Sequence, residues 1–130
     1  LFAADGTAKL GDFFLLRREV MGSIAELSEA AVPQSEYVYH PPEQLDGSRE
    51  ATTAADVYGL GGCLYLALTG MPPFDPNQSL PKLFDQIRNR EVASTHRLNP
   101  QVPVGLDDLV QRTLSKDPAA RPRSPQELLG

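Results

Sequence analysis

The sequence predicts an α+β fold in which a short β-hairpin precedes a mainly α-helical body. Apolar residues among the first ten positions flank the pair Asp5-Gly6, a dipeptide typical of the turn of a two-stranded hairpin. After residue 50, apolar residues recur with helical spacing in three separate segments. At 130 residues, the chain is long enough to bury the core of one domain.

Composition excludes several classes of function. The net charge of −5 argues against nucleic-acid binding, which needs a clustered basic face. The single cysteine, Cys63, rules out an internal disulfide, and the longest apolar run, 57–68, is too short to span a bilayer. No signal segment and no initiating methionine open the chain. We therefore expect a cytoplasmic segment of a longer protein that contacts neither nucleic acid nor membrane.

The first third of the chain predicts little regular structure beyond the hairpin. Residues 15–39 show no apolar period, which predicts a long loop, and long loops in compact domains are often functional. Two prolines, Pro41 and Pro42, close this loop. We expect a single helical turn over residues 43–45.

The strongest predicted helix begins near residue 53. Thr53 is expected to cap it, with Asp56 three residues later as in a capping box, and Gly70 is expected to end it. One apolar stripe is expected along this helix, formed by Val57, Leu60, Leu64 and Ala67. Further apolar residues lie on the other faces, so the helix should be buried in the middle of the domain.

Three further helix signals follow. Residues 80–87 and 106–114 each carry apolar residues at i, i+3 or i+4 spacing, the first with Pro81 in its opening turn. Asp107 and Asp108 are placed to favour the positive end of the second helix. A capping box over 124–127 predicts that one more helix starts just before the chain ends.

Four motifs together resemble the catalytic domain of serine/threonine protein kinases, most closely the bacterial kinases of eukaryotic type. Residues 9–17, KLGDFFLLR, resemble the strand, DFG and L-x-R passage, and residues 39–43, YHPPE, resemble Y-x-A-P-E. Residues 56–74 resemble the buried central helix of the C-terminal lobe and the turn after it. Residues 114–122 resemble the sequence L-x-K-D-P-x-x-R-P near the end of that lobe. All four stand in the family's order.

The resemblance implies a truncated protein-kinase-like fold in which residues 1–130 form a partial kinase domain. This part runs from the metal-binding strand turn through the activation segment and the helices of the C-terminal lobe. The N-terminal lobe and the catalytic loop would lie upstream, so the chain holds no catalytic residue and is not expected to be active alone. The parent would transfer the γ-phosphate of ATP to serine or threonine hydroxyls of a protein.

Asp12 is the expected metal and cofactor residue. The resemblance implies that its carboxylate would coordinate Mg²⁺ that bridges the phosphates of ATP. Without the resemblance, the residues alone indicate only a carboxylate at the end of a strand. Phe14 replaces the glycine of DFG, whose backbone freedom a phenylalanine lacks. Two interpretations remain open: Phe14 packs beside Phe13, or it locks the turn and impairs metal binding.

The residues that match the substrate side of a kinase are Glu36, Tyr39, Pro42 and Glu43. Glu36 stands where the family has a threonine whose hydroxyl bonds the catalytic aspartate and lysine. A carboxylate there would repel the catalytic aspartate, unless Glu36 turns to solvent. The resemblance implies that Glu43 forms a buried ion pair with Arg121. Without the resemblance, both residues would be interpreted as surface charges.

Two helix features complete the expected site. Asp56 would hold the catalytic loop through backbone N–H groups, and its alternative role is to cap its own helix. The run 59–62, GLGG, lies inside a helix and predicts close packing rather than a nucleotide loop.

Three hypotheses follow. The first is the C-terminal lobe of a working kinase with a variant metal turn. The second is the lobe of a pseudokinase, a scaffold that binds partners through the helix carrying Leu83 and Phe84 and the loop before it. The third is a free-standing helical interaction domain.

Overall fold

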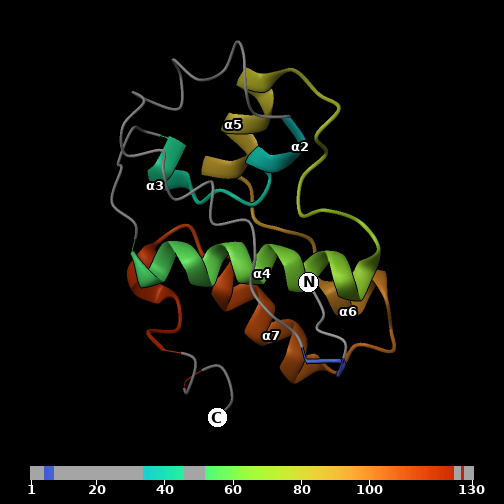
Figure 1. The fold of residues 1–130 in the computed structure, drawn as a ribbon. Helices are drawn as coiled ribbons and strands as arrows, with labels where there is room; N and C mark the ends of the chain where they lie inside the picture. The colour runs from blue at the N-terminus through green and yellow to red at the C-terminus, as the bar shows by residue number, and fades with distance from the viewer. Residues whose placement is uncertain (1–4, 8–33, 46–51, 125–126, 128–130) are drawn as a thin grey trace.

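The structure is a computed structural model that describes residues 5–7, 34–45, 52–124 and 127. These residues are mainly helical, and Figure 1 shows α4 crossing the middle of the molecule between α5 on one side and α7 on the other. The elements are α2 (Gln34–Tyr37), α3 (Pro42–Leu45), α4 (Thr53–Thr69), α5 (Leu80–Asn89), α6 (Thr95–Leu98), α7 (Val104–Thr113) and the 3₁₀ turn η2 (Pro118–Ala120).

The turn of the predicted hairpin is the one part of it that the structure describes. Gly6 has a φ of 82°, and the backbone N–H of Thr7 donates to the side chain of Asp5 at 2.9 Å. The two expected strands lie outside the described residues, so the hairpin stays a prediction. The end of the loop predicted over residues 15–39 is not irregular, because residues 34–37 form the helical turn α2. The turn predicted over 43–45 is present as α3, which begins one residue earlier with Pro42.

The N-terminal cap of α4 lies one residue earlier than predicted. The side chain of Thr52, not that of Thr53, accepts a hydrogen bond from the backbone N–H of Ala55 at 3.1 Å. Asp56 is therefore not in the capping-box position, because that position belongs to Ala55. The C-terminal cap is as predicted: Gly70 has a φ of 73° and its N–H donates to Leu66.

α4 lies in the middle of the fold as predicted, but it is buried on one side only. Tyr58 and Tyr65 are 0% and 2% exposed, whereas Leu60 is 55% exposed. Of the predicted stripe, Val57 is buried and Leu64 is half-buried against the core, whereas Leu60 and Ala67 are exposed. Apolar residues surround this helix, so their spacing does not identify the buried face. That face instead carries two tyrosines and two glycines, Gly61 and Gly62.

Two of the three further predicted helices have the predicted faces, and the helix predicted to start over 124–127 lies mostly outside the described residues. Leu83 and Ile87 of α5 and Val110 of α7 are fully buried. These side chains join a core formed by Tyr37, Val38, Leu45, Tyr58, Tyr65, Phe74, Leu83, Ile87, Val92, Val110 and Leu114. The short helix α6 was not predicted, and it contacts both α4 and α7.

Within the ranges that the structure describes, each helix is too short or too polar to cross a membrane.

Candidate functional site

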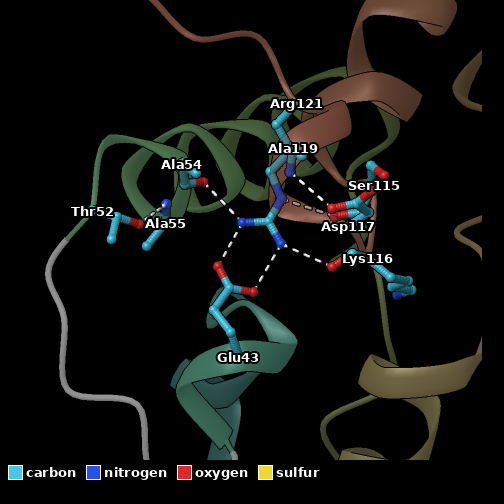
Figure 2. Close-up of polar contacts among 9 residues, drawn as sticks. All are labelled: Glu43, Thr52, Ala54, Ala55, Ser115, Lys116, Asp117, Ala119 and Arg121. Carbon is cyan, nitrogen blue, oxygen red and sulfur yellow. Dashed lines mark hydrogen bonds and ion pairs between the residues drawn. The ribbon is translucent and has the colours of Figure 1, made fainter.

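The guanidinium group of Arg121 is fully buried, and every one of its N–H groups has an acceptor (Figure 2). Two N–H groups bind the two carboxylate oxygens of Glu43, at 2.7 and 2.9 Å. The other three bind backbone carbonyl oxygens of Ser115 at 2.8 Å, Ala54 at 3.0 Å and Lys116 at 3.3 Å. Since arginine carries five N–H groups, this side chain is saturated with hydrogen bonds.

The local sequence explains why Arg121 reaches this position. Asp117 caps η2 by accepting a hydrogen bond from the N–H of Ala119 at 2.9 Å, and Pro118 is the first residue of that turn. The chain leaves η2 in an extended conformation at Arg121. The guanidinium then lies 4.9 Å from the centroid of the Tyr58 ring, a distance suited to a cation–π contact.

Glu43 joins this cluster from the first turn of α3, and 26% of its side chain is exposed. Burial raises the pKa of its carboxyl group, but the hydrogen bonds and charge of Arg121 outweigh burial and hold that pKa below its ordinary value. The paired residues are 78 positions apart in the sequence. Their contact therefore ties the segment 34–45 to the helical body.

Tyr39 provides a second attachment of the same segment. A Cβ atom added at Gly62 would lie 2.8 Å from the ring atom Cδ1 of Tyr39, so the ring rests directly on the backbone of α4. On the neighbouring face, a Cβ atom at Gly61 would lie 2.8 Å from Cβ of Thr113. The glycines thus permit close approach on two faces, as the run 59–62 predicts. Burial, then the nearby Cys63, raise the pKa of the Tyr39 hydroxyl.

Glu36 lies in α2, half-buried, and its backbone carbonyl closes the turn by accepting from the N–H of Tyr39 at 3.1 Å. The next residue, Tyr37, is 2% exposed, and its ring meets the ring of Phe84 edge-on at a centroid distance of 5.3 Å. Leu83 is 0% exposed. Leu83 and Phe84 therefore belong to the interior contacts of α5. The hypothesis that the helix carrying them and the loop before it bind partners stays a prediction.

The remaining predicted site residues are not brought to this cluster. Asp56 is exposed in the first turn of α4, and Thr52 caps that helix instead. Asp12, together with Phe13 and Phe14, lies outside the described residues. Within the described part of the chain, no group of three histidine, cysteine, aspartate or glutamate side chains is arranged to hold a metal ion.

Two features near Arg121 were not predicted from the sequence. The ammonium group of Lys116 lies 4.6 Å from the centroid of the Phe74 ring, and burial, the dominant effect, lowers its pKa to about 8. The hydroxyl of Tyr58 is buried and, within the described residues, has no hydrogen-bond partner. Neither feature has a signal in the sequence, because both arise from the tertiary fold.

The sequence model of the protein kinase domain matches residues 1–129, nearly the whole chain, so the chain is a member of the protein kinase domain family.

Curated serine/threonine kinases from bacteria and from mouse are similar to this chain. The chain is 31% identical to the probable serine/threonine-protein kinase PknB of Lactococcus lactis, over 99% of this chain and 20% of that protein. It is 32% identical to serine/threonine-protein kinase PknL of Mycobacterium tuberculosis, over 93% of this chain and 29% of that protein. Mouse serine/threonine-protein kinase ULK3 is 33% identical over 87% of this chain and 22% of its own length. The chain thus spans about a fifth to a third of these relatives' lengths.

Proposed function

We propose that residues 1–130 form the substrate-side part of the C-terminal lobe of a serine/threonine protein kinase. The whole domain would transfer the γ-phosphate of ATP to serine or threonine hydroxyls of protein substrates, with the N-terminal lobe and catalytic loop supplied by upstream sequence. The observation that supports this most is the contact between Glu43 and Arg121. It fixes the segment that resembles an activation segment to the helices that resemble the body of the lobe.

The described residues would position the protein substrate, and they would take no direct part in phosphate transfer. Glu43 holds the segment 34–45 on Arg121, Tyr39 rests on α4, and Pro42 is buried at the start of α3. Held in this way, the segment would face a protein substrate. Asp56, exposed at the start of α4, would accept hydrogen bonds from backbone N–H groups of the upstream catalytic loop. Fixing a substrate relative to reacting groups lowers the entropic part of the barrier, and this is much of what a kinase does for phosphoryl transfer.

ATP and Mg²⁺ are the cofactors that this function requires. Asp12 is the residue of this chain that would hold the metal ion, since a hard cation prefers carboxylate oxygen. When bound, the metal would neutralise charge on the phosphates that are transferred. This assignment rests on the sequence around residue 12 and on the family.

A pseudokinase is the second candidate, and two residues favour it. Phe14 occupies the glycine position of the metal turn, and Glu36 occupies the position of the threonine that would bond the catalytic aspartate. In this case the lobe would act as a scaffold. Its partner surface would be an exposed one, since Leu83 is completely buried.

Phosphate transfer by the complete parent domain distinguishes the two candidates. We would incubate it with radiolabelled ATP, Mg²⁺ and dephosphorylated casein, beside an Asp12→Asn variant. Asp108→Asn serves as a matched control, because Asp108 is an exposed carboxylate on α7. A working kinase predicts transfer that Asp12→Asn abolishes and Asp108→Asn retains. Absence of transfer from all three folded proteins would establish the pseudokinase instead.

A further inference from the structure

Asp5 and Gly6 lie in an exposed turn that the proposed function does not use. Residues 5–7 are all exposed, and Gly6 has a φ of 82°, in the left-handed region that glycine adopts readily. The carboxylate oxygen Oδ1 of Asp5 accepts a hydrogen bond from the backbone N–H of Thr7 at 2.9 Å. This contact fixes where the carboxyl group lies relative to the main chain.

The hydrogen bond folds the side chain of Asp5 back over the peptide bond between residues 5 and 6. To reach the N–H of Thr7, the carboxyl group must lie alongside Gly6 instead of extending away from the chain. Its carbon, Cγ, is then on the side from which the backbone nitrogen of Gly6 can approach it. Gly6 has no Cβ atom to obstruct that approach, and holding two reacting groups together removes an entropic cost of their reaction.

We propose that Asp5 is a site of spontaneous isomerisation to isoaspartate, through a cyclic imide formed with Gly6. The nitrogen of Gly6 attacks Cγ of the protonated carboxyl group. A bond forms between nitrogen and Cγ, and the carboxyl hydroxyl leaves as water with the amide proton.

Water then opens the imide in one of two ways. Attack at the main-chain carbonyl carbon of Asp5 breaks its bond to nitrogen and leaves the chain linked through Cγ, which is isoaspartate. Attack at Cγ restores aspartate. One water is released and one is consumed, so the reaction needs no other reactant. This inference is independent of the proposed function, because it uses only the turn 5–7.

The N–H of Thr7 also favours closure of the ring. Negative charge develops on a carboxyl oxygen when Cγ becomes tetrahedral, and an N–H already directed at that oxygen stabilises the charge. The hydrogen bond from the backbone of Thr7, and then that from its side chain, lower the pKa of the Asp5 carboxyl group. The protonated form that reacts is therefore scarce at pH 7, and isomerisation should be faster at pH 5.

The test compares the folded parent domain with a peptide of residues 1–9, which has the same Asp-Gly pair without the fold. Both would be incubated in H₂¹⁸O at pH 5 and at pH 7. Opening of the imide inserts one ¹⁸O atom, which mass spectrometry detects in the tryptic peptide that ends at Lys9, and fragmentation of that peptide identifies isoaspartate. The other Asp-Gly pair, residues 46–47, falls in a different tryptic peptide.

Two controls separate this reaction from general exchange of carboxyl oxygens. Asp5→Glu keeps the charge but would have to form a larger ring, so the incorporation of ¹⁸O at residue 5 should fall about tenfold or more. Asp108 is an exposed carboxylate inside α7, where the helix holds the next backbone N–H in a hydrogen bond. We expect no isoaspartate at Asp108.

We expect isoaspartate at residue 5 to form in the folded domain at least as fast as in the peptide, and faster at pH 5 than at pH 7. A slower reaction in the folded domain than in the peptide would overturn the proposal, because the turn would then hold Cγ away from the nitrogen of Gly6. Uptake of ¹⁸O at Asp5 without isoaspartate would also overturn it, because the label would then come from direct exchange with water.

Discussion

Arg121 binds both carboxylate oxygens of Glu43 and, with its remaining N–H groups, the backbone carbonyls of Ala54, Ser115 and Lys116. One side chain therefore joins α3, the start of α4 and the stretch after α7. A lysine has three donors around a single point and cannot reproduce this planar pattern. The pair is thus a structural requirement for holding the segment 34–45 in place.

Gly61 is predicted to tolerate no side chain. A Cβ atom there would lie 2.8 Å from Cβ of Thr113, an atom that moves only if α7 itself moves. Thr113 is also fixed by its hydroxyl, which donates to the carbonyl of Val110 at 2.7 Å. Overpacking of this kind costs about 1–3 kcal/mol, so Gly61→Ala should lower the free energy of unfolding by that amount in urea denaturation of the parent domain.

Gly105→Ala is the matched control for that substitution. Gly105 also lies in a helix, α7, but a Cβ atom there would have no neighbour within 4 Å. Alanine favours a helix over glycine by about 0.5–1 kcal/mol, so this variant should be more stable than the wild type. Equal effects at Gly61 and Gly105 would show that α7 does not approach α4 as closely as described.

Asp107 is predicted to hold α6 on α7. Its carboxylate accepts hydrogen bonds from the hydroxyl of Ser94 at 2.6 Å and from the N–H and hydroxyl of Thr95 at 2.7 and 2.8 Å. Asp107→Asn should cost about 1.5–3 kcal/mol at pH 7, the range for hydrogen bonds to a charged group. Asp108→Asn, at the exposed neighbouring position, should change stability by less than about 0.5 kcal/mol.

The effect of Asp107→Asn should also depend on pH. Burial raises the pKa of the Asp107 carboxyl group, but its hydrogen bonds from Ser94 and Thr95 outweigh burial and lower it overall. A lowered pKa gives stability that is present above the unfolded-state value of about 3.9 and is lost as the pH falls through the folded-state value. The difference between wild type and variant should therefore shrink below pH 4. A difference that stays constant down to pH 2 would contradict the role of the carboxylate.

Lys116 should make stability rise with pH in the alkaline range. Burial lowers the pKa of its ammonium group to about 8, with nearby Glu91 opposing that shift and Arg121 adding to it. Between about pH 8 and pH 10, the unfolded chain keeps this proton and the folded chain has lost it, so folding becomes more favourable as the pH rises. The slope stays below about 1.4 kcal/mol per pH unit, because a single ammonium group binds at most one proton.

Urea unfolding of the wild-type parent domain and of Lys116→Met from pH 7 to pH 10 measures this contribution. The stability of the wild type relative to the variant should increase over that range. Lys82→Met, at an exposed position of α5, provides the control for loss of a lysine charge. Parallel curves for the wild type and Lys116→Met would show that the ammonium group titrates normally.

The sequence was most informative where a local rule applies. Spacing predicted the buried faces of α5 and α7, and the turn residue Gly70 predicted the end of α4. The motifs that resemble a kinase predicted the family, which the comparison with the protein kinase domain confirms. They also led to the expectation that Glu43 meets Arg121, a contact between residues 78 positions apart.

The remaining features depend on tertiary contacts that no local rule describes. The buried side of α4 was mispredicted because apolar residues surround that helix and glycines, which carry no hydrophobic signal, mark its packed faces. The turn α2 was missed because it has only four residues and is held by Phe84, from a distant helix. The same holds for α6, whose N-terminal residues Ser94 and Thr95 bind Asp107.

A double-mutant cycle on Glu43 and Arg121 tests most directly whether this pair anchors the segment 34–45. The free energy of unfolding of the parent domain would be measured for Glu43→Gln, Arg121→Met and the double variant. Removing one partner of a buried pair costs about 3–5 kcal/mol, less here because a quarter of the Glu43 side chain is exposed. We expect a coupling energy of about 2 kcal/mol or more between Glu43 and Arg121. Effects that add to within about 0.5 kcal/mol would contradict it, because the two residues would then act independently.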